Sequence, residues 1–223
     1  MKRITIIGGA FGSGKTEFAL ACALKKRALT DGKTGLIDLD IVNPYFRSRD
    51  RAAELEKLGV TVISTQPGFE YADLPALSPQ IYALLQDQTY QVVVDVGGDP
   101  VGARALGRFN PYFNREAYDF WAVVNPYRPD TRNFAATAAL IAALETASRL
   151  RVTGLVSNIN LGPETNPEIW REGLPLIAEL ADRLQLPLIY HMVESGFYQT
   201  NGSPGGETEF FPVELRMRPA WLA

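Results

Sequence analysis

Short apolar runs alternate with longer helical patterns along this chain. The apolar runs have the length and composition of buried strands, and they cover residues 4–7, 34–37, 60–64, 92–94, 120–124, 152–156 and 187–192. Segments with helical patterning cover residues 17–29, 50–58 and 130–149, and two more begin at Ser78-Pro79 and Asn166-Pro167. This alternation predicts an α/β fold of three layers, in which a mostly parallel sheet of about seven strands is covered by helices on both faces.

Local signals indicate where helices begin and where regular structure ends. Ser78 before Pro79 is typical of an N-cap followed by the first helical residue, and Asp130 is expected to cap the alanine-rich helix that runs to about Arg149. After about residue 196, the glycines and the proline of residues 202–206 indicate an irregular surface tail. Because the 223 residues contain no internal repeat and no linker, we expect a single domain over residues 1–223.

Composition narrows the classes of function. A net charge of −3 and a pI near 5.3 give no broad attraction to nucleic acid, so a nucleic-acid partner is not expected. The single cysteine, Cys22, excludes a disulfide within the chain, and with the single histidine, His191, it argues against a metal chaperone. No apolar run approaches the ~18 residues of a membrane span, and the N-terminus lacks a signal-peptide profile. We therefore expect a cytoplasmic protein.

One glycine-rich segment carries the clearest chemical signal. Residues 9–16, Gly-Ala-Phe-Gly-Ser-Gly-Lys-Thr, fit the pattern G-x-x-x-x-G-K-[ST] between a buried strand and a helix. Glycines at these positions let backbone N–H groups point at phosphate oxygens, and the following helix adds the positive end of its dipole. Lys15 can then reach the β- and γ-phosphates, and Thr16 is the expected Mg²⁺ ligand.

A nucleoside triphosphate with Mg²⁺ is therefore the expected ligand of this loop. The residues predicted to bind it are Gly9, Gly12, Ser13, Gly14, Lys15, Thr16 and Glu17. The side chain of Lys15 is expected to face solvent until phosphate arrives. Asp95 follows three valines, as a Mg²⁺-associated carboxylate does when it projects from a buried strand beside the phosphate loop. The pair Gly97-Gly98 after it would let the backbone approach the γ-phosphate closely.

Four segments together resemble one family of nucleotide-binding proteins. They are residues 9–16, residues 37–40 (Ile-Asp-Leu-Asp), residues 94–98 (Val-Asp-Val-Gly-Gly) and residues 156–158 (Val-Ser-Asn). Over about residues 2–160 the chain resembles the MinD/ParA-type (CobQ/CobB/MinD/ParA nucleotide-binding) P-loop ATPases. The resemblance implies that Asp38 lies near the Mg²⁺ ion and that Asn158 hydrogen-bonds the adenine. It also implies that Asp40 orients the attacking water, so that Lys15 and Asp40 are the catalytic residues.

Two features set the chain apart from that family. Its members usually carry a second, signature lysine directly after the first glycine of the loop, which reaches across a dimer, and this chain has Ala10 there. A dimer-dependent mechanism would then need another cation. Three arginines after the Asp-x-Asp pair, Arg47, Arg49 and Arg51, could bear on one anionic group, or could simply begin a solvated helix.

These observations lead to predictions for the nucleotide base and for the function. GTPases of related folds read guanine with an Asn-Lys-x-Asp loop, and residues 158–161 (Asn-Ile-Asn-Leu) have neither the lysine nor that aspartate, so ATP is preferred. The leading hypothesis is an ATP-binding protein that hydrolyses ATP slowly with Mg²⁺ and acts as a switch towards a protein partner or within a homodimer. The alternatives are a small-molecule kinase or ATP-dependent ligase, and a non-catalytic nucleotide-binding subunit of a larger enzyme.

Overall fold

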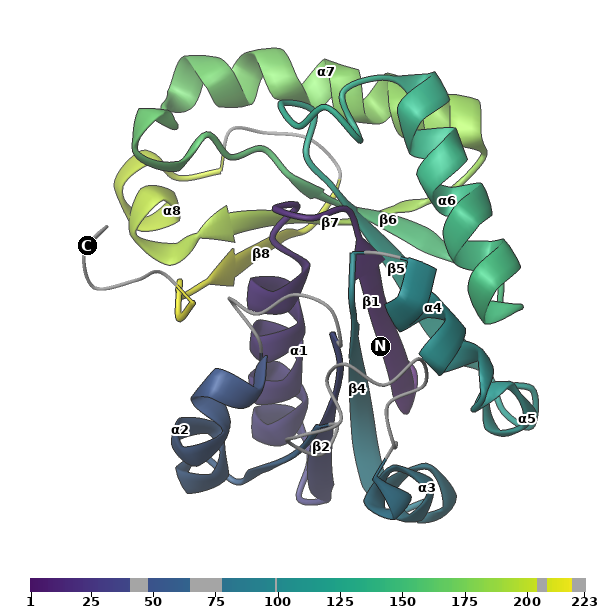
Figure 1. Cartoon of the computed structure of the whole chain (residues 1–223). Helices are drawn as coiled ribbons and strands as arrows, with labels where there is room; N and C mark the ends of the chain where they lie inside the picture. The colour runs from purple at the N-terminus through teal and green to yellow at the C-terminus, as the bar shows by residue number, and fades with distance from the viewer. Residues whose placement is uncertain (41–47, 65–77, 99, 204–207, 218–223) are drawn as a thin grey trace.

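A single parallel sheet runs through the centre of the molecule (Figure 1). The computed structural model describes residues 1–40, 48–64, 78–98, 100–203 and 208–217. Within them the sheet has eight strands in the order β3-β2-β4-β1-β5-β6-β7-β8, and every neighbouring pair is parallel. The strands are β1 (Ile4–Gly9), β2 (Lys33–Leu39), β3 (Val60–Ser64), β4 (Tyr90–Val96), β5 (Tyr118–Val124), β6 (Gly154–Asn158), β7 (Leu188–Glu194) and β8 (Phe210–Val213).

Helices connect the strands and cover both faces of the sheet. They are α1 (Lys15–Leu29), α2 (Ala52–Lys57), α3 (Pro79–Gln86), α4 (Pro100–Gly107), α5 (Asn110–Phe113), α6 (Phe134–Ser148), α7 (Pro167–Leu184) and α8 (Ser195–Asn201), with the 3₁₀ helices η1 (Ser48–Arg51) and η2 (Gly162–Glu164). Helices α1 and α2 lie on one face, and α3 to α7 lie on the other (Figure 1). The predicted three-layer α/β fold is confirmed, with eight strands in place of about seven.

The side chains of β1 alternate between the two hydrophobic cores. All six residues of this strand are buried, as expected for a central parallel strand with helices on both faces. Ile4 and Ile6 belong to the core beneath α3 to α7, whereas Ile7 packs in the core beneath α1 and α2. The second core also contains Phe18 of α1 and Leu55 of α2. This two-sided packing holds β1 in place, and with it the loop that follows.

The tail predicted to be irregular from about residue 196 contains regular structure. Helix α8 follows β7 directly, and β8 pairs with β7 so that His191 lies opposite Phe210. Part of the glycine-rich stretch, residues 204–207, lies outside the described residues. Strand β8 is an edge strand, where the proline at position 212 is tolerated because one side of the strand donates no ladder hydrogen bonds.

Two predicted helix starts have different outcomes. Ser78 caps α3 as predicted, because its hydroxyl oxygen accepts a hydrogen bond from the backbone N–H of Gln80 at 3.3 Å. Helix α6 begins later than predicted, and its cap is Asn133 in place of Asp130, with the Asn133 side-chain oxygen accepting from the N–H of Ala136 at 3.0 Å. The physical reason is that residues 125–131 form a hydrogen-bonded loop before the helix.

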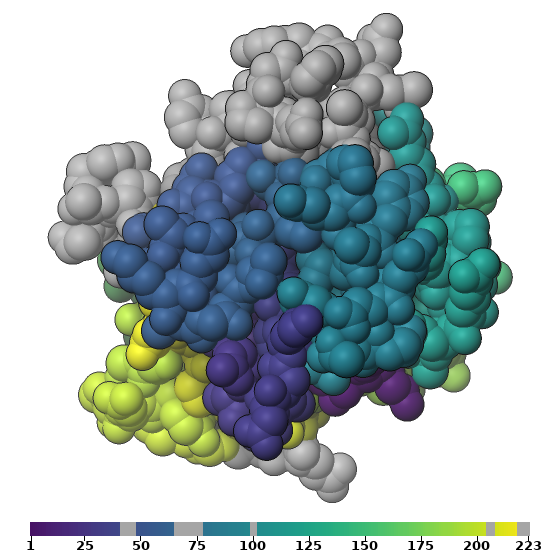
Figure 2. Space-filling view, turned by 90° about the horizontal axis from the view of Figure 1, so that it is seen from below, coloured from purple at the N-terminus to yellow at the C-terminus, as the bar shows by residue number. Residues whose placement is uncertain are grey.

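Parallel strands bring their carboxyl ends to one edge of the sheet, where ligands of open α/β folds bind. The loops after β1, β2, β4 and β6 therefore meet at this edge. Figure 2, seen from below the view of Figure 1, shows residues 48–64 in blue beside residues 78–98 in teal, in agreement with the pairing of β2 with both β3 and β4. No helix in the described part of the chain is long and apolar enough to cross a membrane.

Candidate nucleotide-binding site

The phosphate loop joins the end of β1 to the start of α1. Gly9, Gly12 and Gly14 have φ angles of 154°, 71° and 91°, in the region that side chains other than glycine rarely adopt. A Cβ atom at Gly9 would lie 2.7 Å from the Ser13 hydroxyl oxygen, and one at Gly14 would collide with the side-chain amide of Asn158. The loop is therefore folded so tightly that these positions require glycine.

Helix α1 begins directly after Gly14 and has no capping side chain. The N–H of Phe18 donates to the carbonyl of Gly14 at 3.0 Å. The N–H groups of Lys15, Thr16 and Glu17 therefore precede the first intrahelical hydrogen bond. Such an open N-terminus is an anion site, because the N–H groups and the helix dipole both favour negative charge.

Lys15 is buried, contrary to the expectation that its side chain faces solvent. Its exposed fraction is 4%, and its Nζ atom lies 3.8 Å from Oδ2 of Asp40. The carboxylate of Asp40 is itself buried, at 1% exposure. The Lys15 ammonium group is therefore paired with the carboxylate of Asp40, and a bound phosphate would have to replace that carboxylate as its partner.

Three buried carboxyl groups line the same edge of the sheet. Asp38 and Asp95 are neighbours in the register of β2 and β4, and Asp40 follows the end of β2. The pKa of Asp95 is raised to about 7, chiefly by burial and also by the charges of Asp38 and Asp40, while Lys15 and the Ser48 hydrogen bond oppose the increase. The three carboxyl groups therefore outnumber the two cations that contact them, Lys15 and Arg49.

The 3₁₀ helix η1 places two residues on these carboxylates. The hydroxyl of Ser48, which is fully buried, donates to Oδ2 of Asp95. Arg49 donates to Oδ2 of Asp38 from its backbone N–H (3.0 Å) and from Nε (3.1 Å), and its Nη2 donates to the carbonyl of Asp40 (2.6 Å). Sequence reasoning missed Ser48, because a serine in a loop carries no signal of its own.

Two of the three arginines after the Asp-x-Asp pair, Arg49 and Arg51, have different partners. Arg49 contacts Asp38, whereas Nη1 of Arg51 lies 3.9 Å from Oε2 of Glu54 in the first turn of α2. Arg47 lies outside the described residues. The structure therefore brings together Arg49 and the carboxylates, and it places Arg51 elsewhere.

Asn158 connects the end of β6 to the phosphate loop. Its Nδ2 donates to the carbonyl of Ser13 at 2.8 Å, and the residue is 6% exposed. Two residues on, Oδ1 of Asn160 accepts from the N–H of Gly162 at 2.6 Å. The Asn158 amide thus supports the shape of the loop, and its predicted contact with adenine stays a prediction.

Glu17 uses its carboxylate for another contact. Oε2 accepts from the N–H of Arg216 (2.9 Å), and Oε1 accepts from the N–H of Met217 (2.8 Å). This carboxylate therefore ties the first turn of α1 to the segment after β8. Its backbone N–H remains at the open start of the helix, so a contact of Glu17 with a nucleotide would be made by the backbone.

Mg²⁺ with a nucleoside triphosphate fits this arrangement. Ser13 Oγ and Asp95 Oδ1 are buried and have no hydrogen-bond partner among the described residues, which is uncommon unless a ligand or water completes the site. Within the same residues, no three His, Cys, Asp or Glu side chains are grouped to hold a metal ion alone. Mg²⁺ prefers one or two protein ligands with phosphate oxygens and waters. The Thr16 hydroxyl could supply a direct ligand, and Asp38 and Asp95 could hold its waters.

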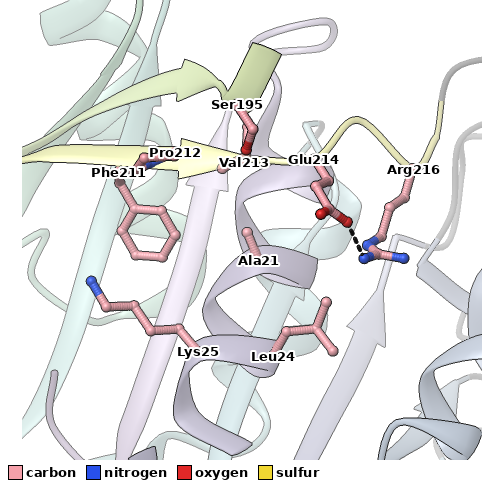
Figure 3. Close-up of a pocket in the computed structure, with 9 residues that line it drawn as sticks. All are labelled: Ala21, Leu24, Lys25, Ser195, Phe211, Pro212, Val213, Glu214 and Arg216. Atoms are coloured by element: carbon pink, nitrogen blue, oxygen red, sulfur yellow. Dashed lines mark hydrogen bonds and ion pairs between the residues drawn. The ribbon is translucent and has the colours of Figure 1, made fainter. Parts of the chain in front are cut away.

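A separate cavity lies between α1 and β8 (Figure 3). It has a volume of about 410 Å³ and shares no lining residue with the phosphate loop. Lys25 extends over the ring of Phe211 on one side, and Arg216 and Glu214 form an ion pair on the other (Figure 3). This cavity is therefore distinct from the nucleotide site.

Comparisons with known proteins support the fold. No protein-family model matches the sequence, and no curated protein matches it. Among solved structures, the chain is similar to the signal recognition particle receptor FtsY from Elizabethkingia anophelis in complex with GDP, with a TM-score of 0.55, 17% identity, and coverage of 85% of this chain and 56% of that one. The chain is also similar to the cell division protein FtsY from Thermotoga maritima, with a TM-score of 0.54 and 17% identity. That match covers 85% of this chain and 61% of the other.

A third similar structure is the signal recognition particle 54 kDa protein from Aeropyrum pernix in complex with GDP, with a TM-score of 0.50 and 17% identity, covering 83% of this chain and 40% of that one. This chain thus spans little more than half the length of the FtsY chains it matches. At this level of identity, the comparisons establish that the chain has the three-layer fold of P-loop nucleoside-triphosphatases.

Proposed function

We propose that this chain binds ATP with Mg²⁺, hydrolyses it slowly and acts as a nucleotide-dependent switch, as the resemblance to MinD/ParA-type ATPases implies. The observation that carries the proposal is the position of Lys15, at the start of α1, beside the buried carboxylate of Asp40 and close to Asp95. A lysine and carboxylates at the carboxyl ends of adjacent strands are the parts that phosphoryl transfer requires.

Each polar group of the site has a role in this proposal. Lys15 exchanges its contact with Asp40 for the β- and γ-phosphates. Thr16 holds Mg²⁺ directly, while Asp38 and Asp95 orient its waters. Asp40, released from Lys15, orients the water that attacks the γ-phosphate.

Two segments are placed to respond to the nucleotide. Ser48 and Arg49 of η1 hydrogen-bond Asp95 and Asp38, so bound Mg²⁺ would compete with η1 for those carboxylates. Gly98, after β4, lies against the phosphate loop, and a Cβ there would be 2.8 Å from the backbone nitrogen of Phe11. Loss of the γ-phosphate would therefore change the positions of η1 and of Gly98 relative to the phosphate loop.

The kinase or ligase alternative has less support in the described residues. It relied on three arginines that hold an acceptor together, whereas Arg49 contacts Asp38 and Arg51 pairs with Glu54. The binding-subunit alternative differs from our proposal only in turnover, which an assay decides.

GTP is the second candidate nucleotide, and one observation favours it. Glu194, at the end of β7, lines a small cavity together with Asn158 and Asn160. A carboxylate there could accept from both the N1–H and the amino group of guanine, and residues 158–161 contain no carboxylate. Two of the similar structures hold GDP, which is in keeping with this alternative.

Calorimetric titration of the purified chain with ATP and with GTP, each with Mg²⁺, tests the proposal. We expect ATP to bind more tightly and to be hydrolysed at about 10⁻² s⁻¹ or below, since no partner supplies catalytic groups. Omission of Mg²⁺ is the matched control. Tighter binding of GTP would replace ATP in the proposal, binding without phosphate release would favour the binding-subunit alternative, and binding of neither nucleotide would refute it.

A further inference from the structure

Arg128 lies against the outside of the phosphate loop. Atoms Cζ, Nε and Nη1 of its guanidinium group are 3.7 to 3.9 Å from the position that a Cβ on Gly12 would take. The loop is open on this side, because Gly12 is exposed and the side chain of Phe11 is 63% exposed. The guanidinium group of Arg128 therefore already lies next to the phosphate loop.

The sheet order explains how Arg128 reaches this position. Strand β5 is the neighbour of β1, with Gly9 opposite Val123, so the loop after β5 runs beside the phosphate loop. Sequence reasoning could not find this residue, because 116 positions separate Arg128 from Gly12 along the chain and only the pairing of β1 with β5 brings them together.

The loop that carries Arg128 is held by hydrogen bonds on both sides. The carbonyl of Asn125 accepts from the N–H of Arg128 (3.0 Å) and from the hydroxyl of Thr131 (2.6 Å). The Asn125 side chain accepts from the N–H of Tyr127 (3.0 Å) and donates to the carbonyl of Asn160 (2.8 Å). The backbone of Arg128 is therefore fixed beside the site, which lowers the entropy cost of using its side chain.

The charges of the site show what such a cation could do. Lys15 lies 3.8 Å from Asp40, and Nε of Arg49 lies 3.1 Å from Asp38, so each of these cations already faces a carboxylate. Arg128 differs, because no carboxylate among the described residues lies within ion-pair distance of it. A polyphosphate that enters the loop would therefore meet a guanidinium group that no carboxylate in the described part of the chain neutralises.

We propose that Arg128 binds the polyphosphate of the nucleotide from the outer side of the phosphate loop, opposite the buried carboxylates. The proposal rests on the proposed function, because it requires a nucleotide in the loop. The guanidinium group turns from its position over Gly12 onto phosphate oxygens, where its planar set of donors can form paired hydrogen bonds. Arg128 is then a nucleotide-binding residue whose contribution depends on the phosphates and not on the base.

Arg128→Gln, with Arg132→Gln as the matched control, tests this role. Arg132 is also exposed and lies only four positions further along, before α6. Affinities for Mg²⁺-ATP, Mg²⁺-GTP and Mg²⁺-tripolyphosphate are measured by calorimetry at several salt concentrations. We expect Arg128→Gln to weaken every ligand that wild type binds by about tenfold or more, and to make binding less dependent on salt, because a charged contact is lost. Arg132→Gln should bind as wild type does.

Arg128→Lys keeps the charge and loses the planar fork, so its affinity should fall between those of wild type and Arg128→Gln. Circular dichroism and thermal unfolding of each variant should match wild type, since both arginine side chains are exposed. Equal losses in Arg128→Gln and Arg132→Gln, or no loss in either, would overturn the role of Arg128 while leaving the proposed function in place. If wild type binds none of the three ligands, both proposals fail.

Discussion

Asp38 and Asp95 lie opposite each other on the adjacent parallel strands β2 and β4, and both are fully buried. Among the described residues, Asp38 has hydrogen bonds to both side-chain oxygens, whereas Asp95 has one to Oδ2 alone. Oδ1 and Oδ2 of Asp38 accept from Asp40 and Arg49. Asp95 accepts from Ser48 through Oδ2, and its Oδ1 has no partner in that part of the chain. The unfilled oxygen points to Asp95 as the carboxylate that a bound metal and its waters would complete.

Asp95→Asn tests that inference. The amide keeps the size of the side chain and can still accept from Ser48, but it lacks the charge that holds a metal-bound water. We expect the Mg²⁺ concentration needed for half-maximal nucleotide binding to rise about 10- to 100-fold. Asp130→Asn, at an exposed position after β5, is the control. An unchanged Mg²⁺ dependence would make Asp95 a structural residue.

Lys15→Ala should lose nucleotide binding and also some stability. Removal of the ammonium takes a charged contact from the phosphates, which corresponds to a loss of about 10- to 150-fold in affinity. It also takes Lys15 away from the buried carboxylate of Asp40, so the free energy of unfolding should fall by about 1–3 kcal/mol. Calorimetry and denaturant unfolding measure the two effects, with Lys25→Ala of the same helix as control. Wild-type affinity in Lys15→Ala would rule out the phosphate-loop assignment.

Asp40→Asn should separate binding from turnover. The side chain is proposed to orient water and not to hold the nucleotide, so affinity should stay within a few fold while single-turnover hydrolysis falls by about 10²-fold or more. Quench-flow measurement of phosphate release with enzyme in excess over ATP gives the rate. Hydrolysis at the wild-type rate would exclude the MinD/ParA-type role of Asp40.

Arg49→Ala and Arg51→Ala form a matched pair. Arg49 hydrogen-bonds Asp38 and Asp40 inside the site, whereas Arg51 pairs with Glu54 of α2. If Arg49 moves onto the γ-phosphate in the transition state, its removal should lower the rate by about 10³ or more. Arg51→Ala should hydrolyse ATP as wild type does. Equal rates in the two variants would remove Arg49 from the mechanism.

We expect the buried side chain of His191 to make the free energy of unfolding depend on pH. It is 4% exposed and its Nδ1 lies 2.6 Å from the Ser157 hydroxyl oxygen, and burial lowers its pKa from 6.5 to about 4. Between these values the unfolded chain binds more protons than the folded one, so this contribution is fully present above about pH 6.5 and is lost as the pH falls towards 4. The slope is at most about 1.4 kcal/mol per pH unit.

Urea unfolding at several pH values between 4 and 7 measures this dependence. In His191→Gln the side chain does not titrate, so the part of the slope that comes from position 191 should disappear. An identical slope in the variant and in wild type would show that His191 is not the group responsible.

The sequence by itself determined the features that depend on local chemistry. The alternation of apolar runs with helical patterns indicated the three-layer fold, and the spacing of Gly9, Gly12 and Gly14 before Lys15 indicated a loop that only glycine can form. Ser78 was recognised as a cap because its partner, the N–H of Gln80, is two residues away. Such signals lie within a few residues, where sequence spacing fixes geometry.

Only the tertiary structure decided the contacts between distant segments. Strand β8 forms where Phe210 pairs beside His191 at the edge of the sheet, whereas in the sequence alone its proline at position 212 argues against a strand. The burial of Lys15 depends on Asp40, and the position of Arg128 on the pairing of β1 with β5. The physical reason is the same in each case, because strand order and packing choose which segments meet, and residue spacing along the chain does not encode that choice.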